Sequence, residues 1–165
     1  MKKTIYFTVQ AAMIAAIYAV LTLIISPISF GPVQLRISEA MIMFAAVTPA
    51  AIPGLTIGCA LANLASPYGL IDIIFGTTAT LLAACFAYGM RNIRIKNIPW
   101  LTPMGAVVFN AFIVSAAIKI VSGADVLYWL SVLEVGAGEL ISCYALGIPL
   151  WLLLEKSGLN SKLSR

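Results

Sequence analysis

Two charged residues stand three positions apart at the start of an apolar stretch, in the segment Phe30-Gly-Pro-Val-Gln-Leu-Arg-Ile-Ser-Glu-Ala40. Residues at this spacing share one face of a helix, so Arg36 and Glu39 can contact each other or converge on one ligand. Arg36 falls in the first turn, where the helix dipole disfavours a cation, so a further group is expected to hold it. The pattern indicates a binding site in which charged side chains hold a polar molecule.

More polar side chains stand within or beside other apolar stretches, and charges in hydrocarbon usually face a cavity or one another. Several have plainer explanations: Asp72 suits a helix N-terminus, Lys119 can snorkel towards water, and Asn63 can bond a neighbouring helix. A pairing of Glu39 with Arg36 would still leave two glutamates without partners. We therefore expect a polar pocket, and its candidate substrate-binding residues are Arg36, Glu39, Asn63, Asp72, Glu134 and Glu139.

The charge of this pocket predicts the kind of ligand. Four carboxylates against Arg36 and Lys119 give a local net charge of −2, an upper bound because buried carboxylates can be neutral. Such a pocket favours a ligand that is cationic or rich in N–H donors over a phosphate or a carboxylate. Aromatic residues at similar depth could stack on a flat ring or belong to the interfacial aromatic belt, and they are Tyr68, Phe75, Tyr128 and Trp129.

Sequence signatures of catalysis are absent. The chain has no histidine, no G-x-x-x-x-G-K-[ST] phosphate loop and no G-x-S-x-G nucleophile motif. Cys59, Cys85 and Cys143 lie in apolar segments and suggest neither a disulfide framework nor a zinc site. We expect no enzyme activity, no metal site and no cofactor in this chain. A carrier of this kind must take its energy from an ion gradient or from a partner.

The elements that position these residues are membrane helices. The chain has 165 residues, of which 62% are hydrophobic and 10% charged, and its mean hydropathy is +1.04. Uncharged runs over 4–35, 40–71 and 97–118 are long enough for helices of about 20 residues to cross a bilayer. We predict an all-α membrane protein, one transmembrane domain over residues 1–165, with six spans. They cover about 7–25, 35–47, 54–65, 70–88, 104–121 and 127–154.

The number of spans and their orientation follow from the basic residues. The second and third spans are short, and they could instead be one kinked helix, because Pro49 and Pro53 interrupt them. Six spans with a cytoplasmic N-terminus place eight of the ten basic residues inside, as the positive-inside rule requires. Both termini are then cytoplasmic, and the charged candidates fall in the outer half of the membrane.

The first span carries small residues at a spacing that lets another helix approach closely. Alanine is also common in membrane helices generally, but five alanines on adjoining faces favour a helix-docking surface. They are Ala11, Ala12, Ala15, Ala16 and Ala19. Gly54 and Gly58, four residues apart in the third span, predict close packing there as well.

Three motif blocks together resemble the QueT family, the substrate-binding (S) components of energy-coupling factor transporters for queuosine precursors. The blocks are Phe30-Gly-Pro-Val-Gln-Leu-Arg-Ile-Ser-Glu-Ala40, Pro53-Gly-Leu-Thr-Ile-Gly58 and Asn63-Leu-Ala-Ser-Pro-Tyr-Gly-Leu-Ile-Asp-Ile-Ile-Phe-Gly-Thr77. The chain length and the six-span layout fit the same family, so the similarity covers nearly the whole chain.

The resemblance implies a six-helix S-component fold in the bacterial plasma membrane, with an outward-facing pocket covered by loops. It also implies docking on a transmembrane coupling protein through Ala11 and Ala15, or through Ala12 and Ala16. Two partner ATPases would drive uptake, so ATP would be hydrolysed outside this chain. The acidic pocket agrees with an aminomethyl-deazaguanine as the ligand, bound by Glu39, Glu134 and Glu139 with support from Asn63 and Asp72.

Two alternatives remain open at this point. The chain could be an S component for another vitamin or nucleobase, which only binding assays distinguish. It could also be a stand-alone ion-coupled carrier or small channel, which predicts uptake without any ATPase and a proton or sodium dependence carried by Glu139.

Overall fold

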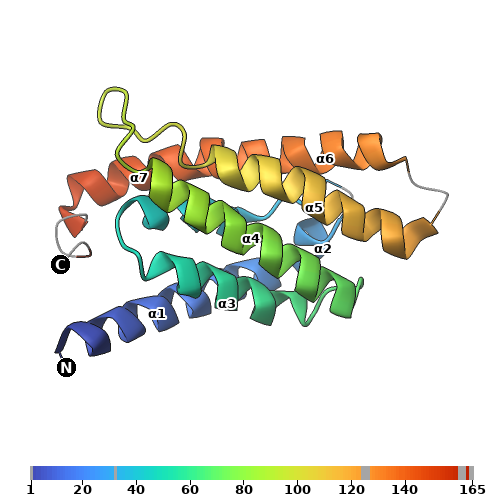
Figure 1. Cartoon of the computed structure of the whole chain (residues 1–165), viewed down its shortest axis with the longest axis horizontal. Helices are drawn as coiled ribbons and strands as arrows, with labels where there is room; N and C mark the ends of the chain where they lie inside the picture. The colour runs from blue at the N-terminus through green and yellow to red at the C-terminus, as the bar shows by residue number, and fades with distance from the viewer. Residues whose placement is uncertain (1, 32, 124–126, 160–162, 164–165) are drawn as a thin grey trace.

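The computed structural model describes residues 2–31, 33–123, 127–159 and 163, and all regular elements in these ranges are helical (Figure 1). In chain order they are α1 (Lys2–Ile24), α2 (Ser26–Ser29), η1 (Ile37–Ala46), α3 (Ala51–Asn63), α4 (Leu70–Met90), α5 (Met104–Ser122), α6 (Tyr128–Leu140), η3 (Ile141–Leu146) and α7 (Gly147–Lys156). The prediction of an all-α fold is confirmed. Each of the six predicted spans coincides with one helical segment, to within five residues at either end.

The long helical segments run alternately in opposite directions (Figure 1). The segment from η1 reverses at residues 47–50 before α3 begins, so η1 and α3 are separate helices and not one kinked helix. The start of α1 and the end of α7 lie at the same end of the bundle, together with the loop over residues 91–103 (Figure 1). The basic residues of α1, of that loop and of α7 therefore gather at one end.

Four of the described helices are long and apolar enough to cross a membrane: α1, α4, α5 and the continuous helix Tyr128–Lys156. The helices η1 and α3 are apolar but shorter. Many large apolar side chains on the long helices are exposed, as expected for surfaces that face lipid. Taken with the composition, the fold is that of a multi-pass membrane protein. The count of six spans stays a prediction.

A close helix contact joins α1 to α3, and two glycines permit it. A Cβ atom added to Gly54 would lie 2.9 Å from the Ala11 carbonyl oxygen, and one added to Gly58 would lie 2.8 Å from the Ala15 carbonyl oxygen. Both distances are shorter than a real Cβ contact, so neither position tolerates a side chain without separation of the helices. The small residues thus let the two backbones touch, as the spacing of Gly54 and Gly58 predicts.

The C-terminal membrane helix is locally widened in its middle. Residues Ile141–Leu146 form a π-helical segment between α6 and α7, and such segments often occur at functional sites because they shift side chains relative to the helix axis. Glu139 lies just before the segment and Cys143 lies within it. In the middle of α7, the Trp151 indole donates a hydrogen bond to the Asn97 carbonyl and fixes the 91–103 loop.

Candidate binding site

A buried ion pair joins η1 to α4. The Arg36 guanidinium lies 3.7 Å from Asp72 Oδ2, and both side chains are only 1% exposed. The Ser66 hydroxyl donates to the same Asp72 oxygen at 2.6 Å, and the Asn63 amide donates to the Asp72 carbonyl at 3.1 Å. The structure therefore brings Arg36, Asn63 and Asp72 together from three separate elements. It pairs Arg36 with Asp72, not with Glu39.

Arg36 lies at the start of a helix and is expected to need a further group to hold it. The segment before η1 supplies such groups. Arg36 Nε donates to the Ser29 carbonyl at 3.3 Å, and its terminal nitrogen donates to Gln34 Oε1 at 3.2 Å. The Phe30 ring lies beneath the guanidinium at 5.2 Å, a cation–π contact. Gln34 adopts a positive φ of 47°, a conformation uncommon for residues other than glycine and typical of constrained functional loops.

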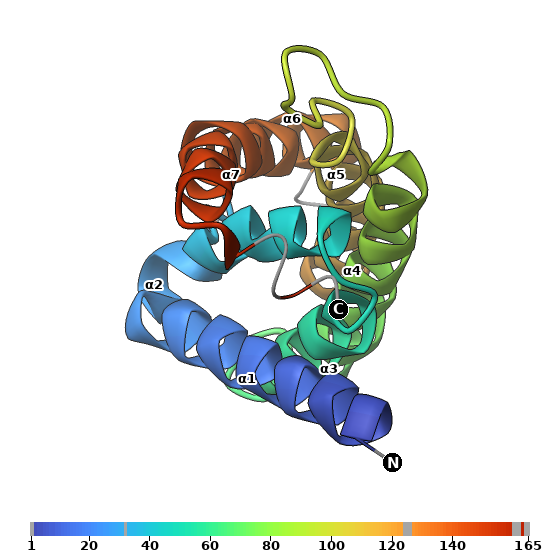
Figure 2. The same ribbon diagram turned by 90° about the vertical axis from the view of Figure 1, so that its left-hand side faces the viewer.

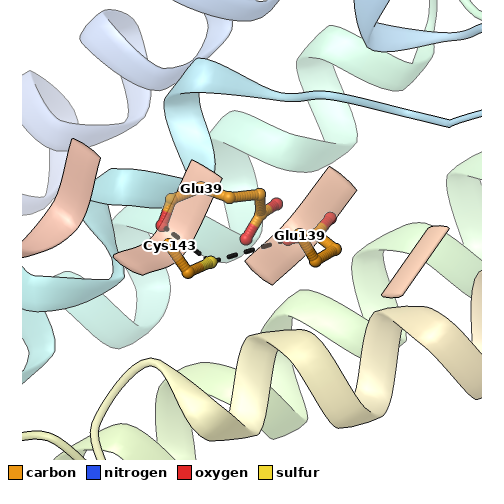
Figure 3. A group of neighbouring side chains, drawn as sticks. All are labelled: Glu39, Glu139 and Cys143. Atoms are coloured by element: carbon orange, nitrogen blue, oxygen red, sulfur yellow. Dashed lines mark hydrogen bonds between the residues drawn. The ribbon is translucent and has the colours of Figure 1, made fainter. Parts of the chain in front are cut away.

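Two glutamates meet in the middle of the bundle. One ligand atom each from Glu39, Glu139 and Cys143 lies within 4.8 Å of the others, and the two carboxylates point towards one another (Figure 3). The Tyr18 hydroxyl donates to Glu39 Oε1. The Cys143 thiol donates to Glu139 Oε2 at 3.6 Å and to the Glu39 carbonyl at 3.7 Å. Such a spacing of donor atoms is compatible with a bound cation between them.

Several buried polar atoms around these groups have no hydrogen-bond partner among the described residues. They are Gln34 Nε2, Asn63 Oδ1, Asp72 Oδ1 and both polar atoms of the Asn110 amide. Buried polar groups in proteins are nearly always hydrogen-bonded, and each exception calls for a reason. Both donors and acceptors are present in this set. It is therefore suited to a ligand that offers both N–H groups and acceptor atoms.

The loop before Arg36 packs directly on α6. A Cβ atom added to Gly138 would collide with the Val33 carbonyl oxygen, so the backbone of the loop reaches α6 only because residue 138 is glycine. This contact lies next to Glu139 in the sequence. The loop is thereby held over the part of α6 that carries the buried carboxylate.

The remaining predicted site residues do not belong to the buried polar cluster. Glu134 is half-buried and stands five residues before Glu139, a rotation of about 140° on an α-helix, so the two side chains point in different directions. Trp129 is 69% exposed and contacts the Tyr128 ring edge-on. Tyr68 and Phe75 are half-buried, and Tyr68 packs against an apolar cluster that includes Val114 and Val135.

The alanines of α1 divide between two faces. Ala11 and Ala15 are buried against the glycines of α3, whereas Ala12 and Ala16 are exposed. A view down the bundle shows α1 at its edge, with α3 on one side (Figure 2). Of the two pairs expected to dock a partner, only Ala12 and Ala16 have a free surface in the described chain.

Three buried residues of the cluster were missed by sequence reasoning: Tyr18, Gln34 and Asn110. Asn110 had a usable signal, because an amide in the middle of an uncharged span is costly in hydrocarbon unless it is functional. Gln34 stands two residues before Arg36 in the segment already singled out. Tyr18 follows Ala11 and Ala15 on one helix face, but nothing in the sequence shows that its hydroxyl meets Glu39.

The helices and the enclosed polar cluster define a multi-pass helical membrane protein in which Arg36, Glu39, Asp72 and Glu139 are buried. A family profile described as QueT transporter matches residues 8–156. The chain therefore belongs to the QueT transporter family and is a transporter, not an enzyme. This confirms the family suggested by the motif blocks.

One curated relative is the queuosine precursor transporter QueT of Lactococcus lactis subsp. cremoris (strain MG1363), which is 37% identical to this chain over 83 residues. That match covers 49% of this chain and 48% of the relative, so the chain spans about half the length of the relative it matches. No solved structure is significantly similar to the chain.

Proposed function

We propose that this protein binds a queuosine precursor of the 7-deazaguanine type, in its aminomethyl form, and is the substrate-specificity subunit of an ATP-driven energy-coupling factor transporter. The observation that carries the proposal is the buried Glu39–Glu139 pair, set beside the Arg36–Asp72 ion pair in a QueT family chain. The name of the Lactococcus lactis relative supports the class of substrate. High affinity is expected because the site is deeply buried.

The chemistry of the cluster suits this ligand. A carboxylate can accept two parallel N–H bonds from a guanine-type edge, and a second carboxylate can neutralise an ammonium group. The unpartnered atoms of Gln34, Asn63 and Asp72 offer donors and acceptors for the remaining polar atoms of the base. Among the aromatic candidates, Trp129 faces outward and is the least suited to contact the base, whereas Tyr68 and Phe75 are half-buried.

We place the protein in the bacterial plasma membrane with both termini in the cytoplasm. The support is the gathering of the N-terminus, the basic 91–103 loop and the C-terminal helix at one end of the bundle (Figure 1), together with the positive-inside rule. In this orientation the ion pair and residues 33–36 lie towards the outside, where a scavenged precursor would enter.

Docking on the coupling protein is assigned to the exposed face of α1 that carries Ala12 and Ala16. Small residues on an exposed helix face allow a partner helix to approach closely in lipid. The two ATPase subunits would then hydrolyse ATP, with no cofactor held by this chain.

Binding is tested with purified protein in detergent. Aminomethyl- and cyano-deazaguanine are titrated, with guanine, biotin and riboflavin as controls. Tight binding of the aminomethyl form supports the proposal, and equal binding of the cyano form contradicts the role given to the carboxylates. Glu139→Gln should weaken binding of the aminomethyl form about 10- to 100-fold, since a charge-assisted bond is lost. Trp129→Ala, a substitution at an exposed ring, should leave it unchanged.

Energy coupling is tested by uptake. Ala16→Leu places a bulky side chain on the proposed docking face and should abolish ATP-dependent uptake while ligand binding in detergent persists. Ala137→Leu, at an exposed alanine of α6, is the matched control and should transport normally. Uptake by this chain alone, without ATPases and with a proton or sodium dependence, would instead establish an ion-coupled carrier.

A further inference from the structure

The Glu39–Glu139 pair has no basic partner bonded to it in the described part of the chain. Arg36 forms its ion pair with Asp72, and among the described residues its other contacts are with Ser29, Phe30, Gln34 and Cys59. Two carboxylates this close in a medium of low dielectric constant cannot both be ionised without a cation between them. Without a cation one of the two carboxylates holds a proton, and with both ionised the pair can hold one positive charge.

A second residue points to the same place. The Asn110 side chain on α5 lies close to both Glu39 and Glu139 and is 1% exposed. Neither its amide nitrogen nor its amide oxygen makes a hydrogen bond of good geometry to any described residue. A buried amide with both polar atoms unpaired is costly to the unliganded protein. Its position beside two carboxylates indicates that it is kept for a ligand.

We propose that Glu39, Glu139 and Asn110 form an ammonium subsite, which selects ligands that carry a primary amine. The inference rests on the proposed function and deepens it, because it assigns the aminomethyl group of the precursor to these three residues. The deazaguanine ring is then left to the Arg36–Asp72 end of the cluster. Asn110 becomes a specificity-determining residue.

The count of donors and acceptors favours an ammonium over a metal ion. A primary ammonium has three N–H donors, and the subsite offers three acceptors: two carboxylates and the Asn110 amide oxygen. The nearby Cys143 sulfur lies 3.6 Å from Glu139 Oε2 and 3.7 Å from the Glu39 carbonyl oxygen, distances at which its thiol proton can be shared with either oxygen. A metal ion would require that proton to leave, since the thiolate is the metal ligand.

The test measures the affinities of both deazaguanines for four proteins: the unmodified chain, Asn110→Leu, Glu139→Gln and Thr102→Val. Thr102 is the matched control, because it is also buried with an unpaired hydroxyl but lies at the start of the α5 region, eight residues before Asn110. We expect Asn110→Leu and Glu139→Gln to weaken the aminomethyl form about 10- to 100-fold and to leave the cyano form unchanged. Thr102→Val should alter neither.

Thermal unfolding of the ligand-free proteins adds an independent readout. Asn110→Leu replaces two unpaired amide atoms by an apolar group of the same shape, so its melting temperature should equal or exceed that of the unmodified protein. If Asn110 were structural, the substitution would lower the melting temperature. An equal loss of affinity for both ligands, or a lowered melting temperature, overturns the inference and leaves the proposed function intact. Binding of the aminomethyl form that a chelator abolishes identifies a metal ion and also overturns it. If neither deazaguanine binds the unmodified chain, the proposed function itself fails.

Discussion

The Arg36–Asp72 ion pair is the interaction whose removal should disturb the fold most. We consider three changes: Arg36→Met, Asp72→Asn and the two together. Each single substitution leaves one charge buried without its partner, whereas the double substitution removes both charges and keeps similar volumes. A double-mutant cycle therefore separates the pairing energy from the cost of desolvation.

The magnitude follows from the geometry. At the observed 3.7 Å and an effective dielectric constant of about 20, the attraction between unit charges is about 4 kcal/mol. Breaking a buried pair from one side costs about 3–5 kcal/mol, because the remaining charge is uncompensated. We expect each single variant to lose that amount of stability, and the double variant to lose less than either alone, as replacement of both charges is often nearly neutral.

The assay is reversible unfolding of the ligand-free protein in mixed detergent micelles, followed by helical circular dichroism. Glu155→Gln, which removes an exposed carboxylate on α7, is the control and should change the free energy of unfolding little. A coupling energy of about 0.5 kcal/mol or less, the range found for exposed pairs, would refute the reasoning. It would mean that water reaches Arg36 and Asp72 despite their burial.

Three further perturbations follow from single contacts. Tyr18→Phe removes the hydroxyl that donates to Glu39, so it should lower the free energy of unfolding by about 1–3 kcal/mol; an unchanged value would show that the bond does not form. Gly58→Ala forces α1 away from α3 and should cost about 1–3 kcal/mol, whereas Gly89→Ala, whose Cβ meets nothing within 4 Å, should be neutral or stabilising in the same unfolding assay. Gly138→Ala should displace the loop at residue 33 and speed ligand dissociation in a stopped-flow experiment, and an unchanged rate would argue against a covering role for the loop.

The helices could be predicted well because the sequence marks them in two independent ways. Long uncharged runs fix where helices lie, and proline, glycine and serine at 26–27, 48–53, 66–69 and 99–103 fix where they end. The tight 3₁₀ winding of η1 could not be predicted, since its residues have no feature that separates it from an α-helix. That winding depends on the helices packed around it.

The division of the alanines on α1 shows where a local pattern is insufficient. Ala11 with Ala15 and Ala12 with Ala16 have the same spacing, so the first helix alone cannot distinguish an internal contact from an external one. The deciding residues lie on another helix: Gly54 and Gly58 match the first pair in spacing and receive it. Faces can be assigned only when both members of a packed pair are considered together.

Glu134 illustrates a different limit, one that simple geometry could have removed. The prediction grouped it with Glu139 by depth in the membrane, but a separation of five residues turns the two side chains about 140° apart. Ser131, Val135, Gly138 and Glu139 form the buried face of α6, and Glu134 lies at its margin. Depth in the membrane shows which residues lie at a similar level. Only the helical period shows which residues lie on the same face of a helix.

The charge balance of the pocket becomes more informative once the pairs are known. The sequence predicts a net excess of two negative charges but cannot say which carboxylates carry it. In the structure Asp72 is paired with Arg36, and Glu134 lies away from the buried face of α6. The carboxylates of the cluster that lack an ion-pair partner in the described chain are therefore Glu39 and Glu139, whose nearest ligand oxygens lie within 4.8 Å of each other. The general preference for cations can thus be assigned to one position, beside Glu39 and Glu139. Discrimination between an aminomethyl and a cyano substituent would depend on this position.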